Sequence, residues 1–449
     1  MSGVPEMVSK KSYRDSLAAL HAPASNPRDP DWLREIREKA FRRFREMGLP
    51  SRRLEAWRTM NLERLLNTPL VAAHGDRAEP SSFDLKEIFG EEEKNGLLFA
   101  NETFLKAWSS APDRANGMIL CDLRSAEKQW SEKIIPLLSQ AAESEANAFS
   151  LVNLFSFTNG IFLYLPAGMV LQAPIHLVIT GAGHPEAPPV FYPRILAIFE
   201  KGAKADLVLH HAGAGKGPYF MNAAAEVLLG EGAKINWVNV QRDAAEGYQF
   251  LTTRCRLSRG SHLEMTDFVE EAGVARHETN VFLNGENSFC SLRGLLLLVG
   301  DSQVFYHAGV EHQAPSATSR QTVKTILGGR AQSEFDSLVH VARDAQRSDS
   351  SQLNRNLLLS DSARAYSKPR FLIDADDVQC THGSATGRLE KDELFYLRSR
   401  GLTKELARFV LIYGFAEEIV ESIVPAGLRR LLEESVRAKL KQMVEGSPC

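Results

Sequence analysis

One turn pattern recurs along the middle of the chain: KGAKADLVL (Lys201–Leu209), EGAKINWVN (Glu231–Asn239), RGSHLEMTD (Arg259–Asp267) and GGRAQSEFD (Gly328–Asp336). The first three glycines lie about 30 residues apart, and each precedes a small residue and a strand-like alternation. Glycine adopts the left-handed backbone of a sharp corner, and strands this short cannot bury a face alone. The pattern predicts the stacked coils of a β-helix. The alternative is a β-sandwich, which is less favoured because clear Asn-Gly and Asp-Gly hairpin turns are scarce.

Short apolar or alternating runs fill residues from about 151 to 388 and predict strands. These runs are Ile161–Leu165, His176–Thr180, Ile195–Phe199, Ala205–His210, Ile235–Val240, Leu263–Val269, Leu295–Val299 and Val304–His307. Helical spacing dominates on both sides of this region. We expect a mostly helical domain over residues 1–150, a β-helix core over 151–388 and a helical domain over 389–449.

The N-terminal helices are expected from Pro30 to Gly48 and over Ser51–Leu66. In the C-terminal domain, Lys391–Arg400 closes at Gly401, and further helices start at Thr403 and Pro425, following the usual start and stop signals.

Composition and charge exclude several classes of protein. The 449 residues carry 53 basic and 56 acidic side chains, a formal net charge of -3, so no global basic field is available to grip nucleic acid. Five scattered cysteines without a CxxC pair argue against a disulfide framework or a self-sufficient structural zinc site. No apolar run reaches the length of about 20 residues of a membrane span, and the start lacks a targeting signal. We therefore expect a cytoplasmic protein without membrane contact.

Several motifs that suggest chemistry fail on inspection. HHAGAGKG (His210–Gly217) lacks the glycine spacing and the final Ser or Thr of a phosphate loop, so the chain is not expected to hydrolyse ATP. GSATG (residues 383–387) has its serine in the wrong place for a hydrolase elbow and is expected to form a turn. On strands, His210 and His211 point to opposite faces, and so do His307 and His312, which makes a metal shared by either pair improbable.

Cys380 and His382 form the candidate metal site. Two positions apart on an extended segment, they share one face, and thiolate and imidazole both suit soft or borderline metals. One cysteine and one histidine cannot complete a four-ligand site. The alternatives are a buried cysteine beside a surface histidine, or a site whose other ligands come from another chain.

Four longer strings resemble the SufB/SufD family of iron–sulfur cluster assembly proteins. They are FDSLVHVARDAQRSDSSQLNRNLLLSDSARAYSKPRFLIDADDVQCTHGSATG (Phe335–Gly387), LFYLRSRGLTKELAR (Leu394–Arg408), LPSRRLEAWRTMNL (Leu49–Leu62) and VEHQAPSATSRQ (Val310–Gln321). Gly383 follows His382 where SufB-like members carry Glu, which favours the SufD branch. Ser337 and Ser348 replace a usual Gly and Thr and change little.

The resemblance implies a right-handed parallel β-helix core flanked by helical domains. It also implies a scaffold subunit, not an enzyme, that pairs with a SufB-like chain and binds the ABC-type ATPase SufC. The cargo would be a transient iron–sulfur cluster shared with SufB, with His382 as the metal ligand and Cys380 as a weaker candidate. Asp376 and Asp377 are candidates to accept a hydrogen bond from the second ring nitrogen of His382. Reduced flavin in the complex stays open, although no dinucleotide fingerprint supports it.

The resemblance also suggests where partners dock. SufC is expected on the C-terminal domain, at apolar positions near Phe409, Tyr413 and Phe415. SufB, or a second copy of this chain in isolation, is expected at sheet edges near Leu338–Val341 and Phe371–Ile373. Two other functions remain open at this point: a β-helix enzyme acting on polysaccharide, and a structural adaptor without ligands.

Overall fold

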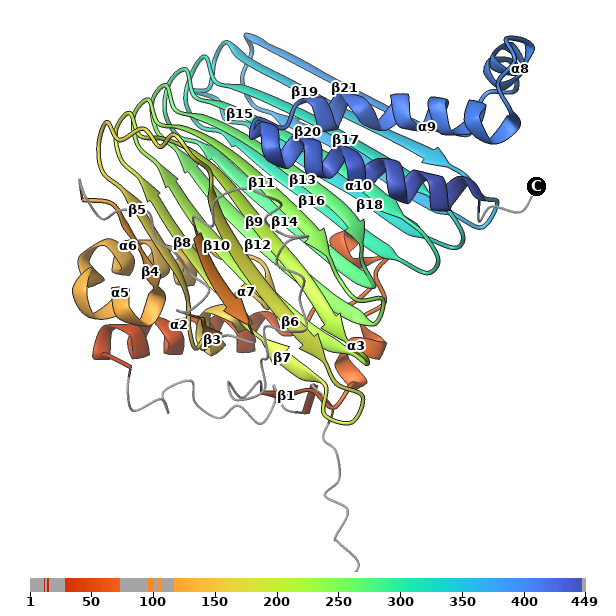
Figure 1. The fold of residues 1–449 in the computed structure, drawn as a ribbon. Coiled ribbons are helices and arrows are strands. Elements are labelled where there is room, and N and C mark those ends of the chain that lie inside the picture. The colour runs from red at the N-terminus through yellow and green to blue at the C-terminus, as the bar shows by residue number, and fades with distance from the viewer. Residues whose placement is uncertain are drawn as a thin grey trace, which may run out of the picture.

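The structure, a computed structural model, describes residues 29–72, 96–100, 103–105 and 117–445, together with Ser12, Arg14 and Asp15. Two long sheets face each other and helices cover their outer sides (Figure 1). Among the described residues, the first sheet has 11 strands and the second has 10.

The first sheet contains β1 (Val71–Ala72), β4 (Ile119–Asp122), β5 (Gly160–Leu165), β7 (Pro189–Phe191), β8 (Arg194–Phe199), β10 (Tyr219–Leu229), β12 (Gly247–Leu257), β14 (Val274–Leu283), β16 (Gln303–His312), β18 (Gln332–Val341) and β20 (Arg364–Ile373). The second contains β2 (Gly96–Ala100), β3 (Thr103–Phe104), β6 (Ile175–Gly183), β9 (Lys204–Gly215), β11 (Lys234–Arg242), β13 (His262–Glu271), β15 (Phe289–Leu298), β17 (Thr318–Leu327), β19 (Ser348–Leu358) and β21 (Val378–Gly387).

Successive strands of the core alternate between the two sheets, and each pairs in parallel with the strand of the next coil. In the first sheet, for example, Tyr248 of β12 lies opposite Val274 of β14. This arrangement is a parallel β-solenoid, so the β-helix prediction is confirmed and the β-sandwich alternative is wrong. All eight predicted runs fall on strands, although β15 ends at Leu298, one residue before the predicted end at Val299.

The quoted turns form the corners between coils. Gly202, Gly232, Gly260 and Gly329 have φ angles of 69°, 67°, 62° and 64°, the left-handed region that glycine enters without steric cost. The turn prediction is therefore confirmed. Small residues follow the first three corner glycines because the next coil stacks closely: Ala203, Ala233 and Ser261 are each 0% exposed.

The N-terminal helices pack on the outer face of the first sheet. Of these helices, α2 (Asp31–Met47), α6 (Ser131–Ser144) and α7 (Ala148–Ser156) share an apolar cluster with β8, β10 and β12, and α5 (Leu123–Gln129) lies beside β5. Buried Arg37 of α2 donates to the carbonyls of Phe155 and Phe157 at 2.8 and 2.7 Å and so ties α2 to the end of α7. The boundary expected at residue 150 falls inside α7.

The helix expected over Ser51–Leu66 is wrong as a single element. The structure has a 3-10 turn η2 (Glu55–Trp57), an extended link and the short helix α3 (Glu63–Asn67). Trp57 is buried between Phe149 of α7 and Phe250 of β12, with ring centroids 5.5 and 6.2 Å away. The segment thus follows the surface of the sheet, because packing of this indole outweighs its helical propensity.

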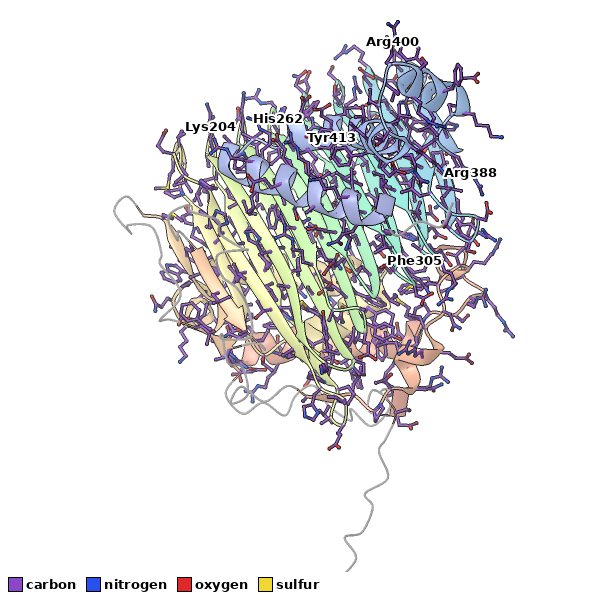
Figure 2. The ribbon with its side chains drawn as sticks, turned by 45° about the vertical axis from the view of Figure 1, so that its right-hand side comes forward. Lys204, His262, Phe305, Arg388, Arg400 and Tyr413 are labelled. Atoms are coloured by element: carbon purple, nitrogen blue, oxygen red, sulfur yellow. The ribbon has the colours of Figure 1, made fainter. Side chains whose placement is uncertain are left out.

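The C-terminal helices cover the outer face of the second sheet. Apolar residues of α9 (Lys404–Glu421) and α10 (Ala426–Glu445), among them Ile412 and Leu432, pack on Phe268, Leu295 and other outward residues of the strands. The helix α8 (Lys391–Ser399) has no buried residue and stands away from both sheets (Figure 1). Figure 2 shows the same contrast, with Arg400 at the outer tip of the module and Tyr413 nearer the sheet.

The two glycine-rich motifs lie on strands. His210–Gly215 belongs to β9, and the next element is the strand β10, not the helix that a phosphate loop requires. Residues 383–387 continue β21 in parallel register with β19, so the turn expected there is wrong. Parallel pairing with β19 holds these residues in an extended conformation.

Candidate functional site

The solenoid ends in an open coil formed by β20 and β21. Each is the last strand of its sheet, so among the described residues neither has a neighbour on its outer edge. Most residues of both strands are exposed or half-buried, whereas the preceding strands are mainly buried. The inner face of this coil is therefore open to solvent in this chain.

Cys380 and His382 lie on this inner face. Cys380 of β21 packs against the interior apolar cluster, and His382 follows two residues later on the same side. The exposed imidazole of His382 stacks on Phe371 of β20, with centroids 5.6 Å apart and planes 6° from parallel. The shared face predicted for the two residues is confirmed, and Phe371 is a neighbour that the sequence analysis placed only on a sheet edge.

The environment of Cys380 disfavours its thiolate. Burial raises the pKa of this thiol above its usual value, and the nearby carboxylate of Asp349 raises it further. Since the thiolate is the form that binds metals, this environment makes Cys380 a poorer candidate for a ligand than its position suggests. The described cysteines Cys121, Cys255 and Cys290 are buried in the cores and do not reach the open coil.

Two expectations about the surroundings of the site need correction. Asp376 and Asp377 lie in the turn before β21, six and five residues before His382, so even Asp377 is roughly 16 Å away along a chain extended at about 3.3 Å per residue. They therefore do not hold the ring. The region Leu338–Val341 belongs to β18, which pairs with both β16 and β20, so it is not an edge, whereas Phe371–Ile373 does lie on the edge strand β20.

The apolar positions named for ATPase docking are also corrected. Phe409, Tyr413 and Phe415 are half-buried and pack against the cluster between α9, α10 and the second sheet. The large exposed apolar side chains are instead Phe395 (75% exposed) and Tyr396 (57%) on α8, with Leu406 and Val410 on α9. Helical periodicity alone could not show that the second sheet covers these side chains, because its strands come from residues about 50 to 200 positions earlier in the chain.

The histidine pairs behave as the alternation predicts. His210 faces outward and lies 3.0 Å from His176, whereas His211 belongs to the interior beside Gln249. His307 contacts Arg276 and Glu334 on the outer face of the first sheet, and His312 contacts Ser319 and Ser348 in the interior.

The fold defines a parallel β-solenoid protein with helical regions at both ends and an open final coil. Residues 179–415 match the family model described as "SUF system FeS cluster assembly, SufBD core domain", and residues 7–177 match "SufBD protein N-terminal region". The chain belongs to the SufBD family of iron–sulfur cluster assembly proteins.

Similarity to individual relatives extends over most of the chain. An iron–sulfur cluster assembly SufBD family protein of Synechocystis sp. is 30% identical over 404 residues, 88% of each chain. The iron–sulfur cluster assembly protein SufD of Escherichia coli is 26% identical over 404 residues, 89% of this chain and 90% of its own length. SufD of Bacillus subtilis is 22% identical over 443 residues, which cover 96% of this chain and 98% of its own length.

Among the described residues, no helix combines the length and apolar character needed to cross a membrane.

Proposed function

We propose that this chain is a SufD-type scaffold subunit of a cytoplasmic SUF assembly complex and has no catalytic turnover of its own. It pairs with a SufB-type chain through its open coil, binds a SufC-type ATPase through its C-terminal helices and contributes His382 to a transient cluster. The observation that carries this proposal is the exposed His382 on the inner face of an edge strand. The family assignment argues against the polysaccharide-acting enzyme.

The geometry supports a cluster shared between two chains. Neighbouring strands in a sheet lie about 4.8 Å apart, so a partner strand added to the edge of β21 would bring its own side chains beside His382. A ligand from each chain is then within reach of one cluster. A site divided in this way is labile when the subunits move, which suits a scaffold that must release its product.

The proposal predicts unequal effects for three substitutions on one face of β21. In the complex coexpressed with SufB-type and SufC-type partners, His382→Ala should lower acid-labile sulfide and bound iron at least fivefold, because it removes the imidazole ligand. Cys380→Ser should have a smaller effect, because the thiol is held protonated. Ser384→Ala is the matched control, since Ser384 shares the face and donates to Ser367 at 2.8 Å but offers no metal ligand.

Subunit content must be measured on the same preparations by gel filtration. Normal cluster content in an intact His382→Ala complex would remove this residue from the site and favour the adaptor without ligands. A larger loss in Cys380→Ser than in His382→Ala would transfer the ligand role to Cys380.

A further inference from the structure

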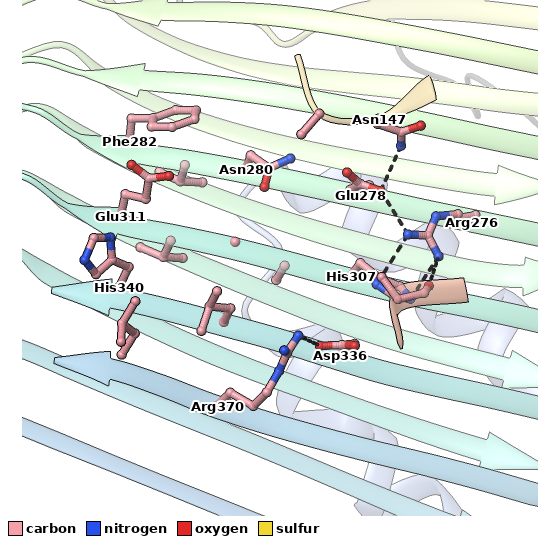
Figure 3. Close-up of a pocket in the computed structure, with 18 of the residues that line it drawn as sticks. Asn147, Arg276, Glu278, Asn280, Phe282, His307, Glu311, Asp336, His340 and Arg370 are labelled. Atoms are coloured by element: carbon pink, nitrogen blue, oxygen red, sulfur yellow. Dashed lines mark hydrogen bonds and ion pairs between the residues drawn. The ribbon is translucent and has the colours of Figure 1, made fainter. Parts of the chain in front are cut away.

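A groove crosses the outer face of the first sheet where the N-terminal helices stop covering it. Its volume is about 330 Å³, and its walls come from β14, β16, β18 and β20, from Ala56–Trp57 and from Asn147 (Figure 3). Leu338 and Leu372 at one side are 37% and 51% exposed, so the groove is open to solvent there. The ligand role of His382 does not use this groove, although Leu372 on its rim also belongs to the edge strand β20.

Three side chains that commonly ligate metals meet beneath this groove, and two of them, His307 and Asp336, line it. His307 projects from β16, and Glu334 and Asp336 project from the adjacent strand β18. One potential ligand atom from each lies within 4.8 Å of the others, and all three residues are at least nine-tenths buried. The register explains the meeting, because His307 lies directly opposite Asp336 and Glu334 is two residues away on the same face.

Each carboxylate has one oxygen held by a donor from outside the cluster and one oxygen that has no such donor. Glu334 Oε2 accepts from the Thr59 hydroxyl and lies 3.4 Å from the Lys368 ammonium, while Asp336 Oδ1 accepts from Arg370. Among the described residues, Asp336 Oδ2 is buried and receives no hydrogen bond, and buried Glu334 Oε1 has no close donor other than a ring nitrogen of His307. Metal-binding carboxylates are oriented in this way, with an outer donor on the oxygen that does not face the ion.

The contacts of His307 also favour a bound cation. Its Nε2 lies 3.1 Å from Arg276 Nη1, which can only donate, and 3.1 Å from Glu334 Oε1, which can only accept. A single ring nitrogen either donates or accepts, so Nε2 cannot serve both neighbours at once. When Nε2 donates to Glu334, Arg276 keeps only its longer 3.5 Å contact with Nδ1. A cation between Nε2 and the carboxylate oxygens satisfies the imidazole lone pair and both unpaired oxygens together.

Arg276 can give up its contact with His307 and still be held in position by its other contacts. Its guanidinium also donates to the Ala56 carbonyl at 3.1 Å and to Glu278 at 3.0 Å, and it lies 3.8 Å from the ring centroid of Trp57 (Figure 3 shows the ion pairs). These contacts remain when the contact with His307 is given up. An ion approaching from the groove therefore needs only a small displacement of one side chain.

We propose that His307, Glu334 and Asp336 bind one divalent first-row transition cation of the Mn²⁺, Fe²⁺, Co²⁺ or Zn²⁺ class. One imidazole and two carboxylates form a donor set suited to these ions, and three protein ligands leave positions for water or for a groove-bound molecule. The positive charges of Arg276, Lys368 and Arg370 oppose a cation, so we expect exchangeable binding, not a permanent structural ion.

The test uses the full-length chain carrying His382→Ala, so that the open coil contributes no imidazole, with Co²⁺ as the probe. Titration should show one bound equivalent, with d–d absorption and a rise in Tm, because an ion that binds only the folded chain stabilises it. Asp336→Asn should weaken Co²⁺ binding at least tenfold and abolish the rise in Tm. Glu311→Gln is the matched control: it lines the same groove outside the three ligands and should bind Co²⁺ like the parent.

Folding of each variant is checked by circular dichroism before titration. If Asp336→Asn does not fold, His307→Ala and Glu334→Gln provide the same comparison. Absence of a bound equivalent in the parent, or equal binding by the parent and the folded ligand variants, would overturn the site. Because the parent already lacks His382, either result is independent of cluster assembly at the open coil.

Discussion

Buried polar side chains form a continuous hydrogen-bond network through the interior of the solenoid. Asp267 accepts hydrogen bonds from Asn239 at 2.7 Å and Tyr306 at 3.0 Å, and it lies 3.2 Å from a ring nitrogen of His277. The whole set consists of His211, Tyr219, Trp237, Asn239, Gln241, Asp243, Gln249, Asp267, His277 and Tyr306, contributed by both sheets or, for Asp243, by the residue after β11. Such a network costs little when every member has a partner, and it fixes the register of the strands that supply it.

Asp243 gives this network a measurable pH dependence. Burial raises the pKa of Asp243 from 3.8 to about 6, although Tyr219 and Gln241 donate to its carboxylate at 2.7 and 2.6 Å. The folded chain holds this proton more tightly than the unfolded chain, so its contribution to stability is lost as pH rises from about 4 to about 6. In Asp243→Asn the amide does not titrate, so the variant does not lose this stability as the pH rises. The free energy of unfolding of the variant, relative to wild type, should rise by up to about 3 kcal/mol across that window.

Denaturant unfolding of both proteins at several pH values measures this difference. Asp376→Asn, which changes an exposed carboxylate, serves as the matched control. A difference between Asp243→Asn and wild type that stays constant with pH would show that Asp243 is ionised in the folded chain throughout.

Among the helices that the structure describes, α8 is the least anchored. It has no buried residue, and it presents Phe395 and Tyr396 to solvent. In contrast, α9 and α10 are tied to the second sheet by ion pairs, including Lys324–Glu418 at 2.6 Å and Lys439–Glu271 at 3.0 Å. Exposed aromatic residues on a protruding helix are typical of protein-binding surfaces.

We therefore expect the double substitution Phe395→Ser and Tyr396→Ser to weaken binding of the SufC-type ATPase at least tenfold without unfolding the chain. Because no residue of α8 is buried in the fold, these substitutions remove contacts with the ATPase but no contacts within the chain. Calorimetric titration with the ATPase measures the effect. The matched control is Val424→Ser, because Val424 is also exposed (50%) but lies beyond the far end of α9.

Deletion of everything after Leu389 is a poorer test than these substitutions. It would uncover the outer face of the second sheet, where Phe268, Leu295 and Ile326 are now covered by α9 and α10. Each exposed side chain of this size costs about 1.5–3 kcal/mol, so loss of binding would be mixed with loss of stability. Unchanged ATPase affinity in the double variant would place the docking surface elsewhere on the module.

Local signals in the sequence predicted the elements better than their surroundings. Glycine corners and alternating runs identified the coils, and Thr403 caps α9 by accepting from the Leu406 amide as a helix start requires. The segment Ser51–Leu66 failed because its indole packs on residues about 90 to 190 positions later. The groove ligands were missed for the same reason: His307, Glu334 and Asp336 meet through the 29-residue register between β16 and β18.

At the scale of the whole molecule, the two ends of the solenoid differ. The first coils carry α5 and the antiparallel strands β3 and β4, whereas the parallel strands β20 and β21 end the sheets without a neighbour among the described residues. Exposed apolar residues gather near this open end, with Tyr366, Leu372 and Ile373 on β20. Open edges of this kind associate with other strands unless they are blocked, and Pro369 on β20 blocks only one position.

We expect the isolated chain to pair through this open end and to form a dimer in light scattering at micromolar concentration. Ala385→Lys places a charge on the exposed edge strand β21 and should shift the dimer towards monomer and weaken pairing with a SufB-type chain, since a charge on an edge opposes strand addition. Val170→Lys adds the same charge at an exposed position near the other end of the solenoid and should leave both associations unchanged. A wild-type chain that stays monomeric at high concentration would limit pairing at the open coil to the SufB-type partner. Dimers that tolerate Ala385→Lys but dissociate with Val170→Lys would place the contact at the opposite end.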